Sequence, residues 1–197
     1  MTEVIQNRRS IRKYKDWEVS REDIEKVLQA GILAPSSKNR QPWKFIVVSG
    51  PAKNGMLAAM RQGLEREKAD PVLPESRRHI GGAEYTLSIM EQAPVTIFVV
   101  NPLGIDLFRP LSTEERVYET CNAQSVGAAI ENMTLTATGL GFGSLWICDT
   151  YFAYRELMAW LNTDGELLAA LTLGHPAESP DPRPRKGVED VTEWRGI

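Results

Sequence analysis

The longest regular pattern in this 197-residue chain has helical periodicity and runs from about Thr113 to Gly139. Around residues 126–130 (VGAAI), the pattern is apolar or small on nearly every side. Such a pattern predicts a helix that is buried all round and whose small residues let another backbone come close. The fold must therefore place other elements against this helix on several sides.

Short apolar runs alternate with helical patterns along the rest of the chain. Residues 43–48, 93–100, 144–148 and 167–174 read as strands, whereas 21–33, 52–67, a short segment after Gly82 and 154–161 read as helices. Strands that are nearly continuous in apolar residues are covered on both faces. The pattern predicts a three-layer α/β or α+β sandwich around one sheet, built as one domain over 1–197. A variable excursion at about 62–84 is the expected lid.

Composition limits the kinds of partner. The formal net charge is -3 and the pI about 5.6, so no global positive field attracts nucleic acid or an anionic membrane. The two cysteines, Cys121 and Cys148, form no CxxC motif, and His79 and His175 are the only histidines. We therefore expect no disulfide framework and no metal site.

Because no signal peptide or membrane-spanning run occurs, a soluble cytoplasmic protein is expected.

Two basic segments are candidate anion sites. The first is residues 8–14 (RRSIRKY), and the second is residues 183–186 (RPRK). Arginine offers a planar fork of donors that matches a phosphate, and a serine hydroxyl adds a short donor. From the residues alone, a solvated basic N-terminus and a solubilising tail are the simpler interpretations.

A polar loop at residues 34–43 (APSSKNRQPW) joins a predicted helix to a predicted strand. It concentrates amides and hydroxyls that could be aimed at the edge of a heteroaromatic ring. The alternative is an ordinary connection whose Ser and Asn side chains satisfy their own backbone.

Taken together, these segments resemble the nitroreductase family of FMN enzymes. The resemblance rests on the order RRSIRKY, APSSKNRQPW, GFGSLWI (141–147), LTLGHP (171–176) and RPRK, and it spans nearly the whole chain. It implies an α+β sandwich with a mostly antiparallel central sheet flanked by helices. It also implies an intertwined homodimer that shares two FMN sites.

The resemblance also implies roles for single residues. Arg8 and Ser10 would bind phosphate or ribityl oxygens together with Arg183 and Arg185, and Arg9 would contribute chiefly its backbone. Arg12 would lie at the pyrimidine end of the ring, where negative charge accumulates on reduction and a fixed cation raises the reduction potential.

Two further segments complete the implied site. The loop residues Pro35, Ser36, Ser37, Asn39 and Gln41 would reach the flavin of the other subunit. The strand end at Ile147 and Cys148 would present a backbone N–H, from Cys148 or Asp149, to the hydride-accepting nitrogen. In this family the flavin carries the chemistry, so no side chain is nominated as catalytic.

The implied reaction is ping-pong transfer of hydride from NAD(P)H to a small electron acceptor such as a nitroaromatic or a quinone. Its specificity would lie in residues 62–84 and in the loop 103–115, where Phe108 and Arg109 could line the pocket. The alternatives are a protein that stores or senses FMN, a reductive dehalogenase, and a flavin-cleaving enzyme of cobalamin ligand synthesis.

Overall fold

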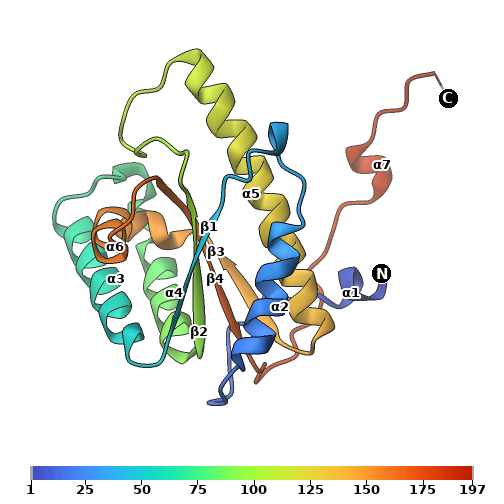
Figure 1. Ribbon diagram of the computed structural model, residues 1–197, viewed down its shortest axis with the longest axis horizontal. Helices are drawn as coiled ribbons and strands as arrows, with labels where there is room; N and C mark the ends of the chain where they lie inside the picture. The colour runs from blue at the N-terminus through green and yellow to red at the C-terminus, as the bar shows by residue number, and fades with distance from the viewer. Residues whose placement is uncertain (1, 197) are drawn as a thin grey trace.

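The computed structural model describes residues 2–196 and has one antiparallel sheet with helices on both faces (Figure 1). The strand order is β1-β2-β4-β3, and each neighbouring pair is antiparallel. The strands are β1 (Lys44–Ser49), β2 (Val95–Asn101), β3 (Gly143–Ile147) and β4 (Glu166–Gly174). Every residue of β2 is buried, as expected for a central strand covered on both faces. The predicted sandwich is confirmed.

Two apolar cores lie on opposite faces of this sheet (Figure 1). One contains α3 (Ala52–Ala69), α4 (Ile80–Gln92), the short 3₁₀ helix η3 (Asp149–Ala153) and α6 (Tyr154–Leu161). The other contains α2 (Arg21–Ile32) and α5 (Thr113–Gly139), and α1 (Thr2–Asn7) packs on α5.

Helix α5 has the bounds that its sequence predicts. It begins after a capping box in which Ser112 and Glu115 exchange hydrogen bonds. The prediction that its middle is buried all round is wrong for a single chain: Gly127 and Ala128 are only half-buried. The physical reason is that α2 and the sheet cover one side of α5, while the stripe that holds these two residues faces outward.

The excursion after α3 is shorter than its sequence suggests. Helix α3 continues to Ala69, and α4 begins at Ile80 and runs for 13 residues instead of forming a short helix after Gly82. Only residues 70–79 are irregular, and they include the 3₁₀ helix η2 (Pro74–His79).

The two chain ends carry helices that the sequence did not predict, namely α1 and α7 (Val188–Val191). Figure 1 shows the chain leaving the body after β4 and ending in an arm that stands away from it. On this arm, Val188, Val191 and Trp194 are each about two-thirds exposed. Within residues 2–196, no helix is both long and apolar enough to cross a membrane.

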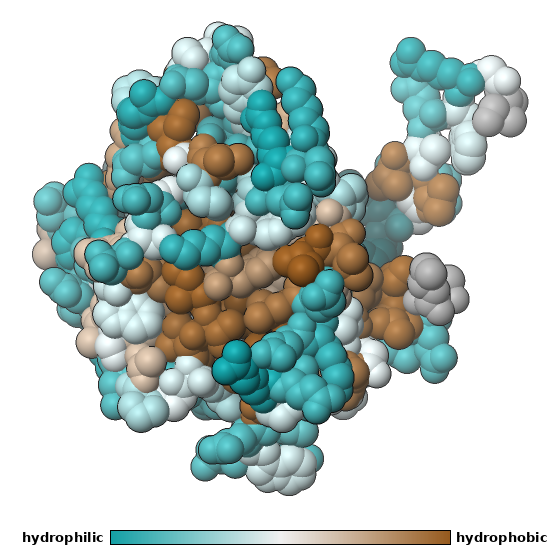
Figure 2. All heavy atoms as spheres, viewed as in Figure 1, coloured by the Kyte–Doolittle hydropathy of each residue, from teal (hydrophilic) through white to brown (hydrophobic). Residues whose placement is uncertain are grey.

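The outer edge of the sheet is apolar where β1 lies. Figure 2 shows an apolar area across the middle of the face seen in Figure 1, in the region of this edge strand. Val47 of β1 is 39% exposed. Because an edge strand offers unpaired N–H and C=O groups to another chain, this edge is suited to contact with a second polypeptide.

Candidate functional site

The first basic segment is fixed against the edge of β3. The Ile11 backbone N–H donates to the Ser144 carbonyl at 2.9 Å, and a β-bridge joins Ser10 to the same residue. A side chain at Gly143 would place its Cβ 2.8 Å from the Ile11 side chain, so only glycine lets Ile11 pack here. Ile11 is thus buried, and its neighbours Ser10 and Arg12 are partly exposed.

The tail that follows β4 runs back along this basic segment. The Ala177 N–H donates to the Lys13 carbonyl at 2.9 Å, and the Arg12 N–H donates to Glu178 Oε1 at 2.6 Å. The buried Tyr14 hydroxyl donates to the Ile11 carbonyl and shares a hydrogen bond with Thr172. These contacts bring residues near position 180 beside residues near position 10.

A cavity of about 570 Å³ lies where these segments meet α1 and α5. Five arginines line it, against two carboxylates from Glu131 and Asp181. The arginines are Arg8, Arg9, Arg12, Arg183 and Arg185, and Ser10 lines the same cavity. The two basic segments of the sequence therefore form one site, although about 170 residues separate them.

Most of the positive charge in this cavity is not neutralised by the protein. Arg8 pairs with Glu131, with 3.5 Å between Nε and Oε1. Arg9, Arg12 and Arg185 instead donate to backbone carbonyls, and over residues 2–196 they form no ion pair. Guanidinium groups with spare donors around a serine hydroxyl match a phosphate monoester in charge and geometry.

The polar loop lies elsewhere in the single chain, at the end of α2 and beside α5 (Figure 1). The Ser37 N–H donates to Ser125 Oγ on α5 at 3.2 Å, and the Gln41 N–H donates to Ser36 Oγ at 3.0 Å. Lys38, Asn39 and Gln41 have φ between 51° and 53°, a conformation that is rare for residues with a side chain. Strained backbone of this kind is often found at ligand sites.

The end of β3 separates its residues between the two faces of the sheet. Ile147 is buried in the core shared with α3 and α4, and the next residue, Cys148, is exposed. Partial desolvation of the sulfur by the surrounding protein and the charge of Asp149 raise the pKa of the Cys148 thiol, so a reactive thiolate is not favoured. Trp146 is 40% exposed and packs 3.5 Å from the position that a Cβ on Gly127 would take.

The single chain thus brings together the N-terminal and C-terminal basic residues, and Pro35, Ser36, Ser37, Asn39 and Gln41 do not line their cavity. Sequence reasoning missed three groups at the site: α1, Glu131 and Glu178. Glu131 and Glu178 carry no local motif, and they contact the arginines only after α5 and the tail are in place.

The loop predicted at residues 103–115 ends at the start of α5 and packs against the body of the chain. Phe108 packs against the core, with Tyr154 at a ring-centroid distance of 5.7 Å and the Arg155 guanidinium over its ring. Arg109 pairs with Glu115 at the start of α5. These contacts hold the loop in place, so a role in lining a substrate pocket stays a prediction for both residues.

A comparison with known families identifies the chain. The model of the nitroreductase family matches residues 5–175, which include the first basic segment, the polar loop and all four strands. The chain belongs to the nitroreductase family. The predicted resemblance is therefore confirmed, and the tail with Arg183 and Arg185 lies beyond the matched residues.

Individual members of the nitroreductase family cover almost the whole chain. A relative from Archaeoglobus fulgidus, named "Putative NADH dehydrogenase/NAD(P)H nitroreductase", is 32% identical, over 90% of this chain and 86% of the relative. A protein from Desulfovibrio desulfuricans, assigned as a nitroreductase and solved in complex with FMN, is 28% identical with a TM-score of 0.74. The alignment covers 100% of this chain and 97% of that one. A BluB-like flavoprotein from Clostridium difficile is 27% identical with a TM-score of 0.73, over 98% of both chains.

Proposed function

We propose that this chain is an FMN-dependent oxidoreductase that uses NAD(P)H to reduce small electrophiles such as nitroaromatics or quinones. The observation that carries the proposal is the cavity lined by five arginines, whose charge is mostly not neutralised by the protein. The FMN complex of the Desulfovibrio desulfuricans relative supports the choice of ligand.

The proposed roles follow from the contacts of each residue. Arg8, Ser10, Arg183 and Arg185 would hold the phosphate, with charge-assisted hydrogen bonds worth about 1.5 to 3 kcal/mol each. Arg12 has its backbone N–H held by Glu178 and its Nη1 held by the Ser10 carbonyl, and the rest of its guanidinium would face the pyrimidine end of the ring.

When bound, FMN supplies the hydride chemistry, and the protein supplies position and electrostatics. The backbone N–H of Cys148 or Asp149 would face the reactive N5 atom. We propose no side chain as general base.

A second copy of the chain would complete each site. In one chain, none of the loop residues 35–41 lines the arginine cavity. The half-exposed Gly127 and Ala128 on α5, the apolar arm and the edge of β1 are separate exposed features that a partner wrapped around the chain could cover. We propose a homodimer in which the loop of each subunit reaches the flavin of the other.

The proposal is tested with purified protein under argon. A yellow protein whose flavin bleaches on addition of NADH or NADPH, and recovers its colour with a quinone, has the proposed activity. A flavin that stays oxidised with both donors indicates a storage or sensing protein. Colourless protein that cannot be reconstituted with FMN contradicts the proposal outright.

The alternative function is that of a flavin-cleaving enzyme. The observation that favours it is the likeness to a BluB-like flavoprotein. A flavin-cleaving enzyme consumes its own cofactor when the reduced protein meets oxygen. Chromatography of the flavin before and after aeration distinguishes the two activities. Recovery of intact FMN supports the oxidoreductase, and stoichiometric loss of FMN supports the cleaving enzyme.

A further inference from the structure

Thr86 of α4 holds the acidic residue that follows the exposed end of β3. Its Oγ1 donates to Asp149 Oδ2 at 2.7 Å, and Thr86 itself is only 6% exposed. Asp149 is the first residue of η3 and comes directly after Cys148. Its carboxylate therefore points to α4, on the same side of the sheet as Ile147.

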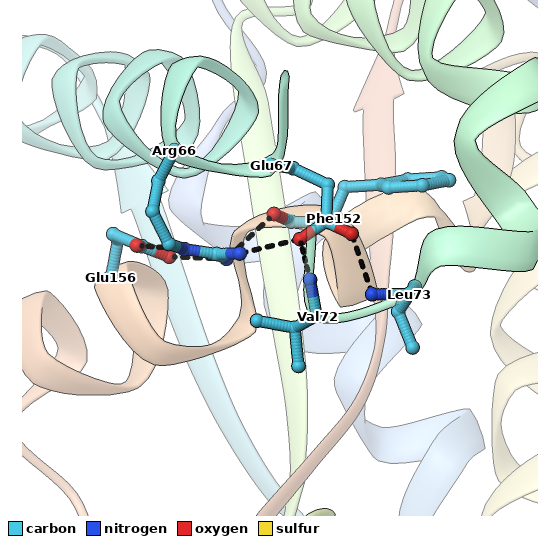
Figure 3. A network of polar contacts seen from close by, with 6 residues as sticks. All are labelled: Arg66, Glu67, Val72, Leu73, Phe152 and Glu156. Carbon is cyan, nitrogen blue, oxygen red and sulfur yellow. Dashed lines mark hydrogen bonds and ion pairs between the residues drawn. The ribbon is translucent and has the colours of Figure 1, made fainter. Parts of the chain in front are cut away.

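The other end of η3 is held from α3 by a partly buried polar network (Figure 3). Arg66 Nη2 donates to the Phe152 carbonyl at 3.1 Å, and its Nε donates to Glu156 Oε1 at 2.8 Å. Arg66 also pairs with Glu67, whose side chain is fully buried. This network fixes the last turn of η3 and the start of α6.

Glu67 extends the same network into the excursion. It accepts hydrogen bonds from the Val72 and Leu73 N–H groups, at 3.1 and 2.6 Å (Figure 3). Burial raises the pKa of Glu67, but these two donors and Arg66 outweigh it and hold the pKa below its ordinary value. The carboxylate thus stays ionised and keeps η3, α3 and residues 72–73 in one arrangement.

The far end of η3 is thus held by Arg66, and at its near end, beside Cys148, Thr86 holds the Asp149 side chain. The adjacent Thr150 is fully buried, and over residues 2–196 its hydroxyl has no hydrogen-bond partner. Thr150 therefore gives this segment packing but no directional contact.

We propose that Thr86 is a positioning residue, which acts through the Asp149 carboxylate to aim the Cys148–Asp149 backbone at N5 of the flavin. This inference rests on the proposed function. It adds a residue of α4 to the site, and α4 directly follows the excursion at residues 70–79.

The experiment replaces Thr86 with Val, which has the same shape without the donor, and with Ser, which keeps it. FMN labelled with ¹⁵N reports the hydrogen bond at N5 in the oxidised holoprotein without turnover. We expect T86V to move the N5 resonance, and to slow flavin reduction by NAD(P)H about three- to tenfold, the equivalent of one hydrogen bond. T86S should restore the N5 resonance and the reduction rate. The FMN affinity of either variant should differ from that of wild type by less than about threefold.

Thr96→Val is the matched control. Thr96 is a fully buried threonine of β2 whose hydroxyl has no partner over residues 2–196, so its loss should leave the N5 resonance unchanged. Asp149→Ala removes the acceptor instead of the donor. It should reproduce the T86V spectrum, and the double variant should be no worse than either single variant. D149A therefore tests the same hydrogen bond even if the T86V protein does not fold.

An N5 resonance and a reduction rate that are unchanged in both T86V and D149A overturn the inference. A wild-type protein that binds no FMN, or whose FMN no nicotinamide donor reduces, instead contradicts the proposed function. The two failures are therefore distinguishable.

Discussion

Asn101 of β2 links two acidic residues: it is the sheet partner of Glu166 on β4, and its side chain donates to Glu119 Oε2 on α5 at 3.4 Å. Burial and the neighbouring carboxyl groups of Glu119 and Asp106 raise the pKa of Glu166 to about 8. A carboxyl group that is protonated at neutral pH thus lies below the loop that joins β2 to α5.

This pair predicts a loss of stability at alkaline pH. Glu166 has a pKa near 4.5 when unfolded and about 8 when folded, so its contribution is complete below the lower value and is lost as the pH rises through the higher one. Glu166→Gln should remove this loss. The side chain is half-buried and screened by solvent, so the effect is small. We expect E166Q to be more stable to unfolding than wild type by about 1 kcal/mol at pH 9, which raises Tm by roughly 2–4 °C.

Thermal unfolding of wild type and E166Q at pH 5 and pH 9 measures this effect. The advantage of E166Q should appear only at the higher pH. The exposed Glu18→Gln serves as the control, since it removes the same charge from the surface. An E166Q protein with the same pH dependence as wild type would show that the pair ionises normally.

Arg8 should discriminate between flavins with and without a phosphate. Arg8→Ala removes a guanidinium that lines the cavity beside Ser10, so the Kd for FMN should rise about 10- to 150-fold, the range for one charge-assisted contact. Affinity for riboflavin, which lacks the phosphate, should not change. Fluorescence titration of the apoprotein with both flavins measures the ratio.

Arg21→Ala is the charge-matched control for Arg8, because Arg21 is exposed on α2 and pairs only with Glu25 over the described chain. It should leave both affinities unchanged. If R8A weakens the binding of riboflavin as much as the binding of FMN, Arg8 acts on the ring or on folding, and its proposed contact with the phosphate is wrong.

Arg12 should act on the reduction potential more than on binding. Its backbone N–H is held by Glu178 and its Nη1 donates to the Ser10 carbonyl, so the segment keeps its path when the side chain is shortened. Arg12→Ala should lower the flavin potential by about 30 mV for each tenfold loss of preference for the reduced form. Spectroelectrochemical titration measures the shift, and Arg12→Lys, which keeps the charge, should recover part of it. No shift in R12A would remove the proposed role.

The sequence predicted elements whose ends are marked by local chemistry. The bounds of α5 were predictable to the residue because Ser112 and Glu115 form a capping box and glycines follow Gly139. Helices α1 and α7 have six and four residues, too few for a clear periodic pattern, and α1 is stabilised by packing on α5.

The residue types of the site were predictable, but their convergence was not. Arg8 and Arg183 are both recognisable as anion-binding residues, and only the return of the tail along residues 11–14 places them in one cavity. Glu131 lies in the middle of a helix, and Thr86 lies on a helix that the sequence predicts only weakly. Their roles depend on tertiary contacts with Arg8 and Asp149, and no short-range pattern records such contacts.

The proposed dimer gives the final prediction, because α5 and the C-terminal arm expose apolar surface that a single chain leaves uncovered. Sedimentation should show a dimer at micromolar concentration. Ala128→Glu, which places a charge on the half-exposed stripe of α5, and deletion of residues 187–197 should each give monomers that lose FMN on gel filtration. Ala58→Glu, at an exposed position of α3, should remain a dimer with FMN. A wild-type monomer that retains FMN would mean that one chain suffices for the site, and the loop at residues 35–41 would then have no flavin to reach.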